Sequence, residues 1–292
     1  MALTSERIPD QVRGRTRAII AEKALRAAPR NLWWATRKAV ASASHRLTAR
    51  QGTSGSPPSA ALYCVYRSKN APHVVTLIQQ LGQGVDVHLH ALDVTHPHLE
   101  ASTRSEGPGQ RMQLLARLME GHPSAPDAWV VIADDDVTFR WDADGRRFRS
   151  LAKLAGFDLA QPAHFPGSNH VYRLNALHHA SIARATHYVE VGPLVIASPC
   201  AIEGMMPIPD DVGMGWGLDI EWSHLDGIRK GVVDATPILH HGNVSSEYSA
   251  ALEQETLDRY LARHGLVDVR SFVDGSRGLA WRPWQKEAAW SR

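Results

Sequence analysis

Length, composition and net charge set the first limits on what this chain can be. Its 292 residues suffice for one large α/β domain or two small ones, and 43% of hydrophobic residues is enough for a globular core. A net charge of only +2 argues against a dedicated nucleic-acid-binding protein, so we expect no nucleic-acid partner. Neither cysteine, Cys64 nor Cys200, lies in a Cys-x-x-Cys pair, so a zinc ribbon or a disulfide framework is not indicated.

The N-terminal residues 1–50 differ from the rest of the chain in charge. They contain eleven Lys or Arg against three acids, with apolar residues between them at partly helical spacing. This pattern predicts a helical extension made of one or two basic amphipathic helices. The extension either packs on the main domain or rests on an anionic membrane face, with Trp33 and Trp34 at the interface.

Signals for secretion and for membrane insertion are missing from the sequence. No apolar run approaches the ~20 residues that cross a bilayer, and the N-terminus lacks the continuous apolar core of a secretory signal. We therefore expect a soluble, cytoplasmic protein. If the basic extension rests on a membrane, the protein is peripheral to its inner face.

Beyond the extension, the pattern divides into a linker, a main domain and a tail. Residues 51–59 are rich in Gly, Ser and Pro and predict a linker. From 60 to 270, short apolar runs alternate with helical patterns, which is typical of a mainly parallel sheet flanked by helices. The expected strands cover 61–66, 85–92, 129–133, 156–160, 188–197 and 231–239, and the expected helices cover 73–81, 110–120 and about 246–264. Residues 271–292 form a tail with three tryptophans, which either packs on the domain or covers a substrate cleft.

Three aspartates follow the apolar strand at 129–133. The run VVIADDDVTF places Asp134, Asp135 and Asp136 at the carboxyl end of that strand, where ligands bind in open α/β sheets. Adjacent carboxylates repel one another, so a hard divalent cation, Mn²⁺ or Mg²⁺, is the economical explanation, and a solvated acidic turn is the structural alternative. Alternation along the chain lets Asp134 and Asp136 reach the metal while Asp135 points to ribose or sugar hydroxyls. Such a metal would neutralise the charge on a departing nucleoside diphosphate.

The same run fits a second chemistry. Asp134-x-Asp136-x-Thr138 after apolar residues is how haloacid-dehalogenase-like phosphohydrolases begin, with the first aspartate as nucleophile, the second as acid/base and Mg²⁺ between them. That motif normally occupies the first strand of its domain, whereas about two βα units precede it here. No lysine follows at a clear strand end to neutralise a phosphoryl group. We therefore keep the phosphohydrolase as the alternative enzyme class.

A glycine- and tryptophan-rich run supplies the next candidates. In GMGWGLDIEW, glycines let the backbone approach a ligand closely, and the indole of Trp216 can stack on a sugar ring. If the reaction inverts at the anomeric carbon, a carboxylate must deprotonate the incoming hydroxyl, and Asp219 is the first candidate with Glu221 second. The structural alternative is a Gly-Trp turn in which Asp219 caps a helix over 220–228.

Two histidines at the end of the strand 231–239 are candidate metal ligands. A neutral imidazole arriving beside the aspartates would complete a coordination sphere suited to Mn²⁺, and either His240 or His241 can supply it. A structural role is the alternative for whichever of the two is not the ligand.

The remaining candidates are expected to contact the nucleotide. Gly109 lies just before the predicted helix at 110–120 and Arg111 lies in its first turn, where backbone amides and a guanidinium can meet a diphosphate or a base. Tyr66 and Arg67 end the first strand and Asp93 follows the second, where nucleoside contacts are expected in this architecture.

Taken in order, these motifs resemble the GT-A-like proteins of the domain-of-unknown-function 707 family. The similarity covers roughly residues 60–243, and its strings are FDLAQPA (157–163), VEVGPLV (189–195), GWGLD (215–219), GVVD (231–234) and the His-His-Gly run (240–242). The family's acidic triplet matches residues 134–136, although the middle residue here is Asp rather than the more usual Glu. The resemblance implies a GT-A-like fold and glycosyl transfer, and it favours His240 over His241 as the metal ligand.

The sequence therefore predicts a metal-dependent glycosyltransferase. Its expected donor is a nucleoside-diphosphate sugar, and its expected acceptor is a hydroxyl of a glycan, a lipid or a small molecule. The alternatives are the phosphohydrolase and a non-catalytic protein that binds a nucleotide sugar or a carbohydrate. The donor sugar, the acceptor and the stereochemistry of transfer do not follow from the sequence.

Overall fold

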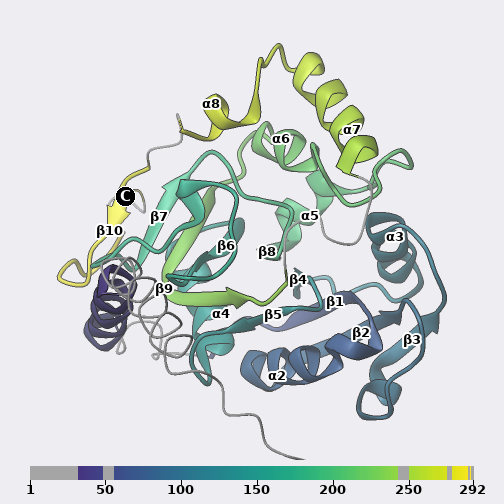
Figure 1. Cartoon of the computed structure of the whole chain (residues 1–292), viewed down its shortest axis with the longest axis horizontal. Coiled ribbons are helices and arrows are strands. Elements are labelled where there is room, and N and C mark those ends of the chain that lie inside the picture. Colours follow the sequence, from purple (N-terminus) through teal and green to yellow (C-terminus); the bar gives the residue numbers. More distant parts are fainter. Residues whose placement is uncertain (1–31, 49–55, 243–249, 275–277, 289, 291–292) are drawn as a thin grey trace, which may run out of the picture.

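The computed structural model describes residues 32–48, 56–242, 250–274, 278–288 and 290. One sheet forms the centre of the domain (Figure 1). Its strands are β1 (Ala60–Tyr66), β2 (Val85–Ala91), β3 (Thr103–Glu106), β4 (Trp129–Ala133), β5 (Val137–Phe139), β6 (Leu159–His164), β7 (Ala183–Thr186), β8 (Leu194–Ala197), β9 (Lys230–His240) and β10 (Ala280–Trp281). The helices are α2 (Ala71–Leu81), α3 (Arg111–Gly121), α4 (Asp144–Leu154), α5 (Pro199–Met205), α6 (Leu218–Ser223), α7 (Ala250–Arg263) and α8 (Val269–Asp274), with 3₁₀ turns η1 (Ser68–Asn70), η2 (Pro97–Ser102) and η3 (Arg173–Asn175).

The sheet is mixed but mainly parallel. Its order is β10-β7-β9-β6-β8-β4-β1-β2-β3, and β5 pairs separately with β9. Strands β1, β2, β3, β4, β6 and β9 all run in one direction, because β8 is antiparallel to both β4 and β6. The predicted α/β fold with a mainly parallel sheet flanked by helices is therefore confirmed.

Helices cover both faces of this sheet (Figure 1). Side chains of α2 and α4 pack on one face, against β1, β4, β6 and β9. Side chains of α3, α5 and α6, joined by one tyrosine of α7, pack on the other face. Strand β4 is buried along its whole length, which explains its continuous apolar sequence.

Within the described residues, three predicted elements differ from their expected bounds by three residues or more, and the predicted start of the helix at about 246 lies outside the described part. The strand predicted over 188–197 begins only at Leu194, since a Gly-Pro pair precedes it and proline cannot donate to the ladder. The strand predicted over 156–160 is β6, shifted to later residues because Gly156, with a φ of 66°, ends α4 in the left-handed region. The helix predicted over 220–228 is the shorter α6, and its N-terminal cap is Gly217 rather than Asp219.

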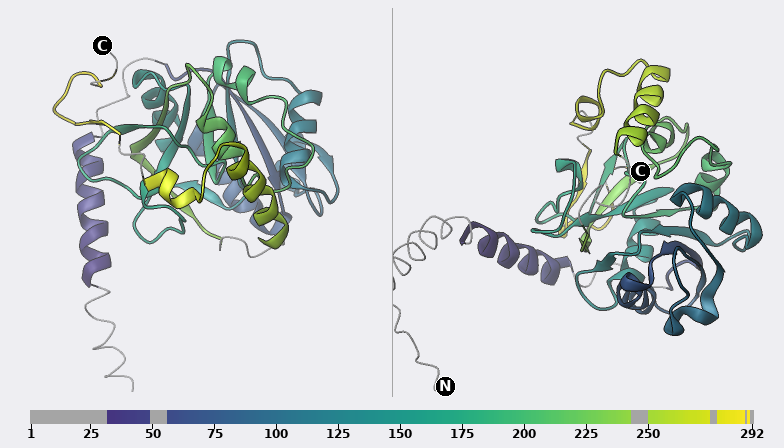
Figure 2. Two further views of the ribbon diagram at one scale, coloured as in Figure 1. Left: turned by 90° about the horizontal axis from the view of Figure 1, so that it is seen from above. Right: turned by 45° about the vertical axis from the view of Figure 1, so that its right-hand side comes forward.

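An N-terminal helix and a C-terminal tail lie outside the main domain in the sequence, and both contact it. Residues 32–48 are helical, in agreement with the predicted extension, and residues 1–31 lie outside the described part. Figure 2 shows this helix reaching out from the domain, and it is attached near its C-terminal end, where Ala41, Ser44 and Thr48 are buried. In the tail, Trp281 is buried in the main core and the ring of Trp290 stacks on Phe157, so these side chains pack on the domain. Among the described residues we find no helix with the length and apolar character needed to cross a membrane.

Candidate metal centre and its surroundings

The acidic triplet forms the turn between two strands. β4 ends at Ala133, and the chain passes through Asp134, Asp135 and Asp136 before Val137 begins β5. The backbone N–H of Asp134 donates to the carbonyl of Pro193 at 2.7 Å, which holds this turn against the segment before β8. Because β5 pairs antiparallel with β9 and sets Val137 opposite His240, the register delivers this imidazole to the triplet.

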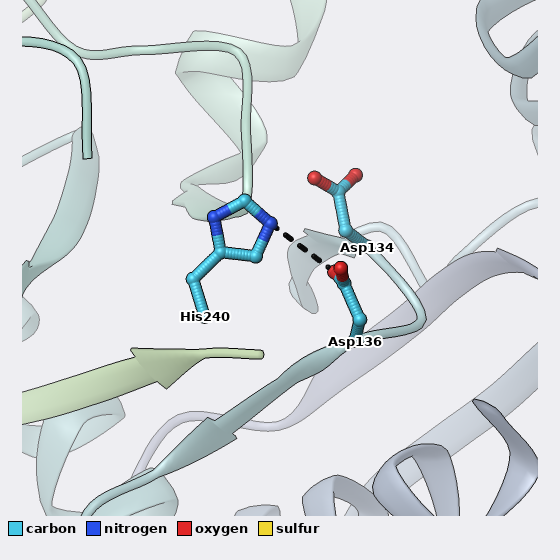
Figure 3. Close-up of side chains that lie close together, drawn as sticks. All are labelled: Asp134, Asp136 and His240. Atoms are coloured by element: carbon cyan, nitrogen blue, oxygen red, sulfur yellow. Dashed lines mark ion pairs between the residues drawn. The ribbon is translucent and has the colours of Figure 1, made fainter. Parts of the chain in front are cut away.

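Asp134, Asp136 and His240 gather into one cluster (Figure 3). One potential ligand atom from each of these side chains lies within 4.8 Å of the other two. The Nε2 of His240 is 3.3 Å from Oδ1 of Asp136, and the guanidinium of Arg111 is 2.6 Å from Oδ1 of Asp134. Two carboxylates and an imidazole form a donor set that suits Mn²⁺. The residues present therefore fit a divalent cation.

The second histidine of the pair lies elsewhere. Nε2 of His241 is 2.8 Å from Oγ1 of Thr138, and its ring stacks on His73 at a centroid distance of 4.1 Å. The structure thus brings His240, and not His241, to the carboxylates. This is the choice that the family resemblance favoured and that metal chemistry alone left open.

Burial and mutual charge shift the pKa values of this cluster. Burial raises the pKa of Asp134, and Arg111 opposes that rise, while burial also raises the pKa of Asp135. Burial acts to raise the pKa of Asp136 as well, but hydrogen bonding and the charge of His240 bring it below its ordinary value. Burial acts to lower the pKa of His240, and the two neighbouring carboxylates raise it overall. A bound divalent cation would stabilise the ionised forms of these buried carboxylates.

Asp135 holds the backbone rather than facing the cluster. Its Oδ2 accepts a hydrogen bond from the backbone N–H of Arg67 at 2.7 Å, which ties the end of β1 to the end of β4. Tyr66 is fully buried, with its hydroxyl 3.0 Å from Oγ1 of Thr103. The contacts of Tyr66, Arg67 and Asp135 with a nucleotide sugar remain predictions.

Three further predicted nucleotide contacts lie at nearby strand and helix ends. Asp93, beyond β2, accepts hydrogen bonds from the backbone N–H and the hydroxyl of Ser68 at 2.9 and 3.0 Å. Arg111 is the first residue of α3. At Gly109 just before it, a β-carbon would lie 3.0 Å from Leu114, so a larger residue would crowd the helix start.

The glycine-rich run 213–217 is a loop held between two helices. The carbonyl of Gly213 accepts from the backbone N–H of Met112 at 2.8 Å, and the N–H of Met214 donates to Oε2 of Glu253 at 3.0 Å. Gly217 has a φ of 96°, in the left-handed region that favours glycine. Trp216 is half-buried in this loop, and its stacking on a sugar remains a prediction.

The two predicted catalytic acids have different surroundings. Asp219 is buried, and its Oδ2 accepts a hydrogen bond from the Tyr188 hydroxyl at 2.5 Å. Burial raises the pKa of Asp219 to about 6, against the effect of that hydrogen bond. Glu221 instead forms ion pairs with Arg263 at 2.7 Å and His264 at 3.1 Å. The structure therefore places Glu221 in a charged contact with the C-terminal end of α7, away from Tyr188 and Asp219.

One acidic residue near the cluster was missed by the sequence reasoning. Glu190 lies between β7 and β8, and burial, Asp219 and Asp134 raise its pKa well above its ordinary value. Its position in VEVGPLV, two residues before a Gly-Pro pair that touches the aspartate turn, was the available signal. That contact joins residues far apart in the sequence, so the spacing alone did not reveal it.

Comparison with known proteins finds similarity at the level of solved structures. No family model and no curated protein matches the chain, so the narrower resemblance to the domain-of-unknown-function 707 family remains a prediction. One similar structure is GalNAc-T7 with UDP, GalNAc and Mn²⁺. The match covers 70% of this chain and 48% of the GalNAc-T7 chain, with a TM-score of 0.47 and 9% sequence identity. The mannosyltransferase PcManGT from Pyrobaculum calidifontis with GDP-Man and Mn²⁺ matches 84% and 74%, with a TM-score of 0.45 and 14% identity.

A further similar structure is glucosyl-3-phosphoglycerate synthase from Mycobacterium tuberculosis with Mn²⁺, UDP and glucosyl-3-phosphoglycerate. It matches 83% of this chain and 91% of its own, with a TM-score of 0.42 and 16% identity. The chain spans about half the length of the GalNAc-T7 structure. Likeness at these scores says nothing about activity, so the function has to be argued from the geometry of the site.

Proposed function

We propose that this chain is a glycosyltransferase of the GT-A type, which moves a sugar from a nucleoside diphosphate to a hydroxyl acceptor. The observation that carries the proposal is the meeting of Asp134, Asp136 and His240 at the carboxyl ends of β4 and β9. Two carboxylates, one imidazole and no further ligand within the described cluster leave coordination positions for diphosphate oxygens. A cation held there would act as a Lewis acid on the leaving diphosphate.

The protein side chains have separate tasks in this reaction. Arg111 stands at the start of α3 beside Asp134, where its guanidinium can bind a diphosphate oxygen in a charge-assisted hydrogen bond. Asp135 fixes the end of β1 through Arg67 and so keeps the rim of the nucleotide site in place. The loop with Trp216 offers a half-buried ring against which a sugar can pack.

A screen of UDP- and GDP-sugars with Mn²⁺ tests this proposal. We expect one donor to be hydrolysed slowly, with release of the nucleoside diphosphate, and we expect the release to stop when Mn²⁺ is chelated. Phosphate release from p-nitrophenyl phosphate that depends on Asp134 would instead indicate the phosphohydrolase. Binding of a nucleotide sugar with no turnover in any acceptor mixture would indicate the non-catalytic alternative.

We also propose that the helix 32–48 contacts an anionic membrane surface. Trp33, Val40 and Leu47, spaced by seven residues, are 50%, 44% and 69% exposed. The described helix carries Arg37, Lys38 and Arg46 and no acid. Exposed apolar residues beside basic ones are what an interfacial helix presents to anionic lipids.

Sedimentation with lipid vesicles measures this contact. The full chain should sediment with phosphatidylglycerol-containing vesicles, and high salt should release it because surface charges are screened. Trp33→Ala should reduce the bound fraction several-fold, whereas Trp284→Ala, at another exposed tryptophan, should leave it unchanged. Equal binding to neutral phosphatidylcholine vesicles, or no binding to either, would contradict the membrane contact.

A further inference from the structure

We propose that Glu190 is the catalytic base that takes the proton from the attacking hydroxyl, and that Asp219 is a positioning residue behind it. This inference rests on the proposed glycosyl transfer and replaces the sequence prediction that Asp219 is the base. It follows from where the segment 190–193 lies, from how its backbone is held, and from how the carboxylate of Asp219 is hydrogen-bonded.

The segment 190–193 lies between the metal centre and the glycine-rich loop. On one side, the carbonyl of Pro193 accepts from the N–H of Asp134, and a β-carbon at Gly192 would lie 3.1 Å from Oδ2 of Asp134. On the other side, a β-carbon at Gly215 would lie 3.0 Å from Val191. Glu190 therefore stands on the piece of chain that connects the cation ligands to the loop of Trp216, which is where donor sugar and acceptor would meet.

Buried amides fix the backbone of Glu190. Its N–H donates to Oε1 of Gln161 at 2.6 Å, and Nε2 of Gln161 donates to Oδ1 of Asn175 at 2.6 Å. Gln161 and Asn175 are 2% and 0% exposed, so this chain of hydrogen bonds is shielded from water. The residue itself is only half-buried. These hydrogen bonds hold the backbone of Glu190 in a fixed place beside the aspartate turn, and a base must be held in a fixed position.

Asp219 is already committed to partners within the protein. Its Oδ2 accepts from the hydroxyl of Tyr188, its Oδ1 accepts from the backbone N–H of Ile220 at 3.0 Å, and the residue is 8% exposed. Both oxygens therefore already accept a hydrogen bond from the protein, and little of the side chain is exposed to an acceptor hydroxyl. The charge of Asp219 instead acts on Glu190, whose pKa is raised by burial first and by Asp219 next.

The carboxylate of Glu190 accepts the proton of the acceptor hydroxyl while the hydroxyl oxygen forms a bond to the anomeric carbon. The bond between that carbon and the diphosphate oxygen breaks, and its electron pair leaves with the nucleoside diphosphate. Glu190 then returns its proton to solvent. The sugar changes its anomeric configuration, because oxygen attacks from the face opposite to the diphosphate.

Hydrolysis of the sugar nucleotide that the screen selects tests the assignment. Water is the acceptor, and the released nucleoside diphosphate is measured. Glu190→Gln should lower turnover by a factor of about 100 or more, in the range for loss of a general base, and should leave the Mn²⁺-dependent binding of UDP or GDP within about twofold. The matched control is Glu203→Gln, an equal charge change at an exposed position on α5, which should turn over like the wild type. Thermal melting of each variant verifies that it is folded.

Rescue by a small carboxylate separates a base from a structural residue. Formate should restore part of the turnover of Glu190→Ala and should leave Asp219→Ala unchanged. Full activity in Glu190→Gln, or rescue of Asp219→Ala alone, would overturn the assignment while the transferase proposal stands. A wild-type protein that turns over no sugar nucleotide would overturn the transferase proposal and this inference together.

Discussion

At the scale of single residues, the triplet Asp134, Asp135 and Asp136 shows how like side chains acquire different tasks. The first and third gather with His240, and the middle one holds the backbone of Arg67. The sequence predicted that Asp134 and Asp136 would share a site from which Asp135 is turned away, and the turn between β4 and β5 produces this division. The electrostatic cost of the three carboxylates makes a bound cation the simplest account of their position.

Asp136→Asn should remove the cation without unfolding the protein. The change deletes one ligand charge and keeps the side-chain shape, so Mn²⁺ together with UDP or GDP should no longer raise the melting temperature. Turnover should fall by a factor of about 10² or more, since the leaving diphosphate loses its Lewis acid. Asp142→Asn, at an exposed aspartate beyond β5, is the matched control and should behave like the wild type. An undiminished thermal shift in Asp136→Asn would show that the cation binds elsewhere.

Asp219 should make stability depend on pH. Its folded-state pKa of about 6 lies above the ordinary value, mainly through burial, so the folded protein holds this proton more tightly than the unfolded chain does. Its contribution to stability is complete below about pH 4 and is lost as the pH rises through 6. Asp219→Asn carries no such proton. The free energy of unfolding of this variant, relative to wild type, should therefore rise by up to about 3 kcal/mol between pH 4 and pH 7.

Urea denaturation of both proteins at several pH values measures this difference. Other titrating groups are shared by the two proteins, so they cancel except where they interact with Asp219 itself. A difference that stays constant from pH 4 to pH 7 would mean that the folded-state pKa of Asp219 is ordinary.

The residues of the site were predictable to different degrees. The aspartates and His240 could be found because they follow apolar strands directly, and the carboxyl ends of strands are where sites form. The positions of Glu190 and Asp219 could not be predicted. Glu190 is held by Gln161 and Asp219 is bound by Tyr188, and only the folded sheet brings these pairs together.

At the scale of elements, burial determined what the sequence could reveal. β4 and most of β9 are buried, and their apolar runs predicted them. β5 and α4 are among the elements that were not predicted. β5 is only three residues long, and α4 reads DGRRFRSLAKL, with many polar side chains and an internal glycine. That glycine is required because a β-carbon at Gly145 would lie 2.6 Å from the carbonyl oxygen of Gln80 in α2. Such a close approach of helices is tertiary information that local periodicity does not contain.

Gly217 should be intolerant of a side chain because it starts α6 in the left-handed region against a neighbour. A β-carbon there would lie 2.6 Å from the ring of Tyr260, whereas Gly227, also left-handed with a φ of 71°, faces open space. Gly227→Ala should cost only backbone strain, about 1 kcal/mol, and Gly217→Ala should cost about 1–3 kcal/mol more through overpacking. Urea unfolding of the two variants measures this difference. Equal losses would mean that Tyr260 moves aside freely.

At the scale of the whole molecule, the sheet brings the functional residues to one edge. β1, β4, β6 and β9 run in the same direction, so their carboxyl ends lie together although the residues come from distant parts of the sequence. β8 runs antiparallel to β4 and β6, so its amino end lies beside their carboxyl ends. The segment before β8, which contains Glu190, therefore reaches the sheet at that same edge. The fold thus explains how an acid from one half of the chain can serve a cation site built mainly by the other.

The central claim is that Asp134, Asp136 and His240 hold a cation that binds a nucleoside diphosphate. Crystals soaked with Mn²⁺ and UDP or GDP, with anomalous diffraction recorded at the manganese absorption edge, test it most directly. The account predicts one strong anomalous peak within coordination distance of these three side chains, with diphosphate oxygens completing its shell. A peak at another place, or nucleotide bound with no manganese between it and the aspartates, would contradict the account.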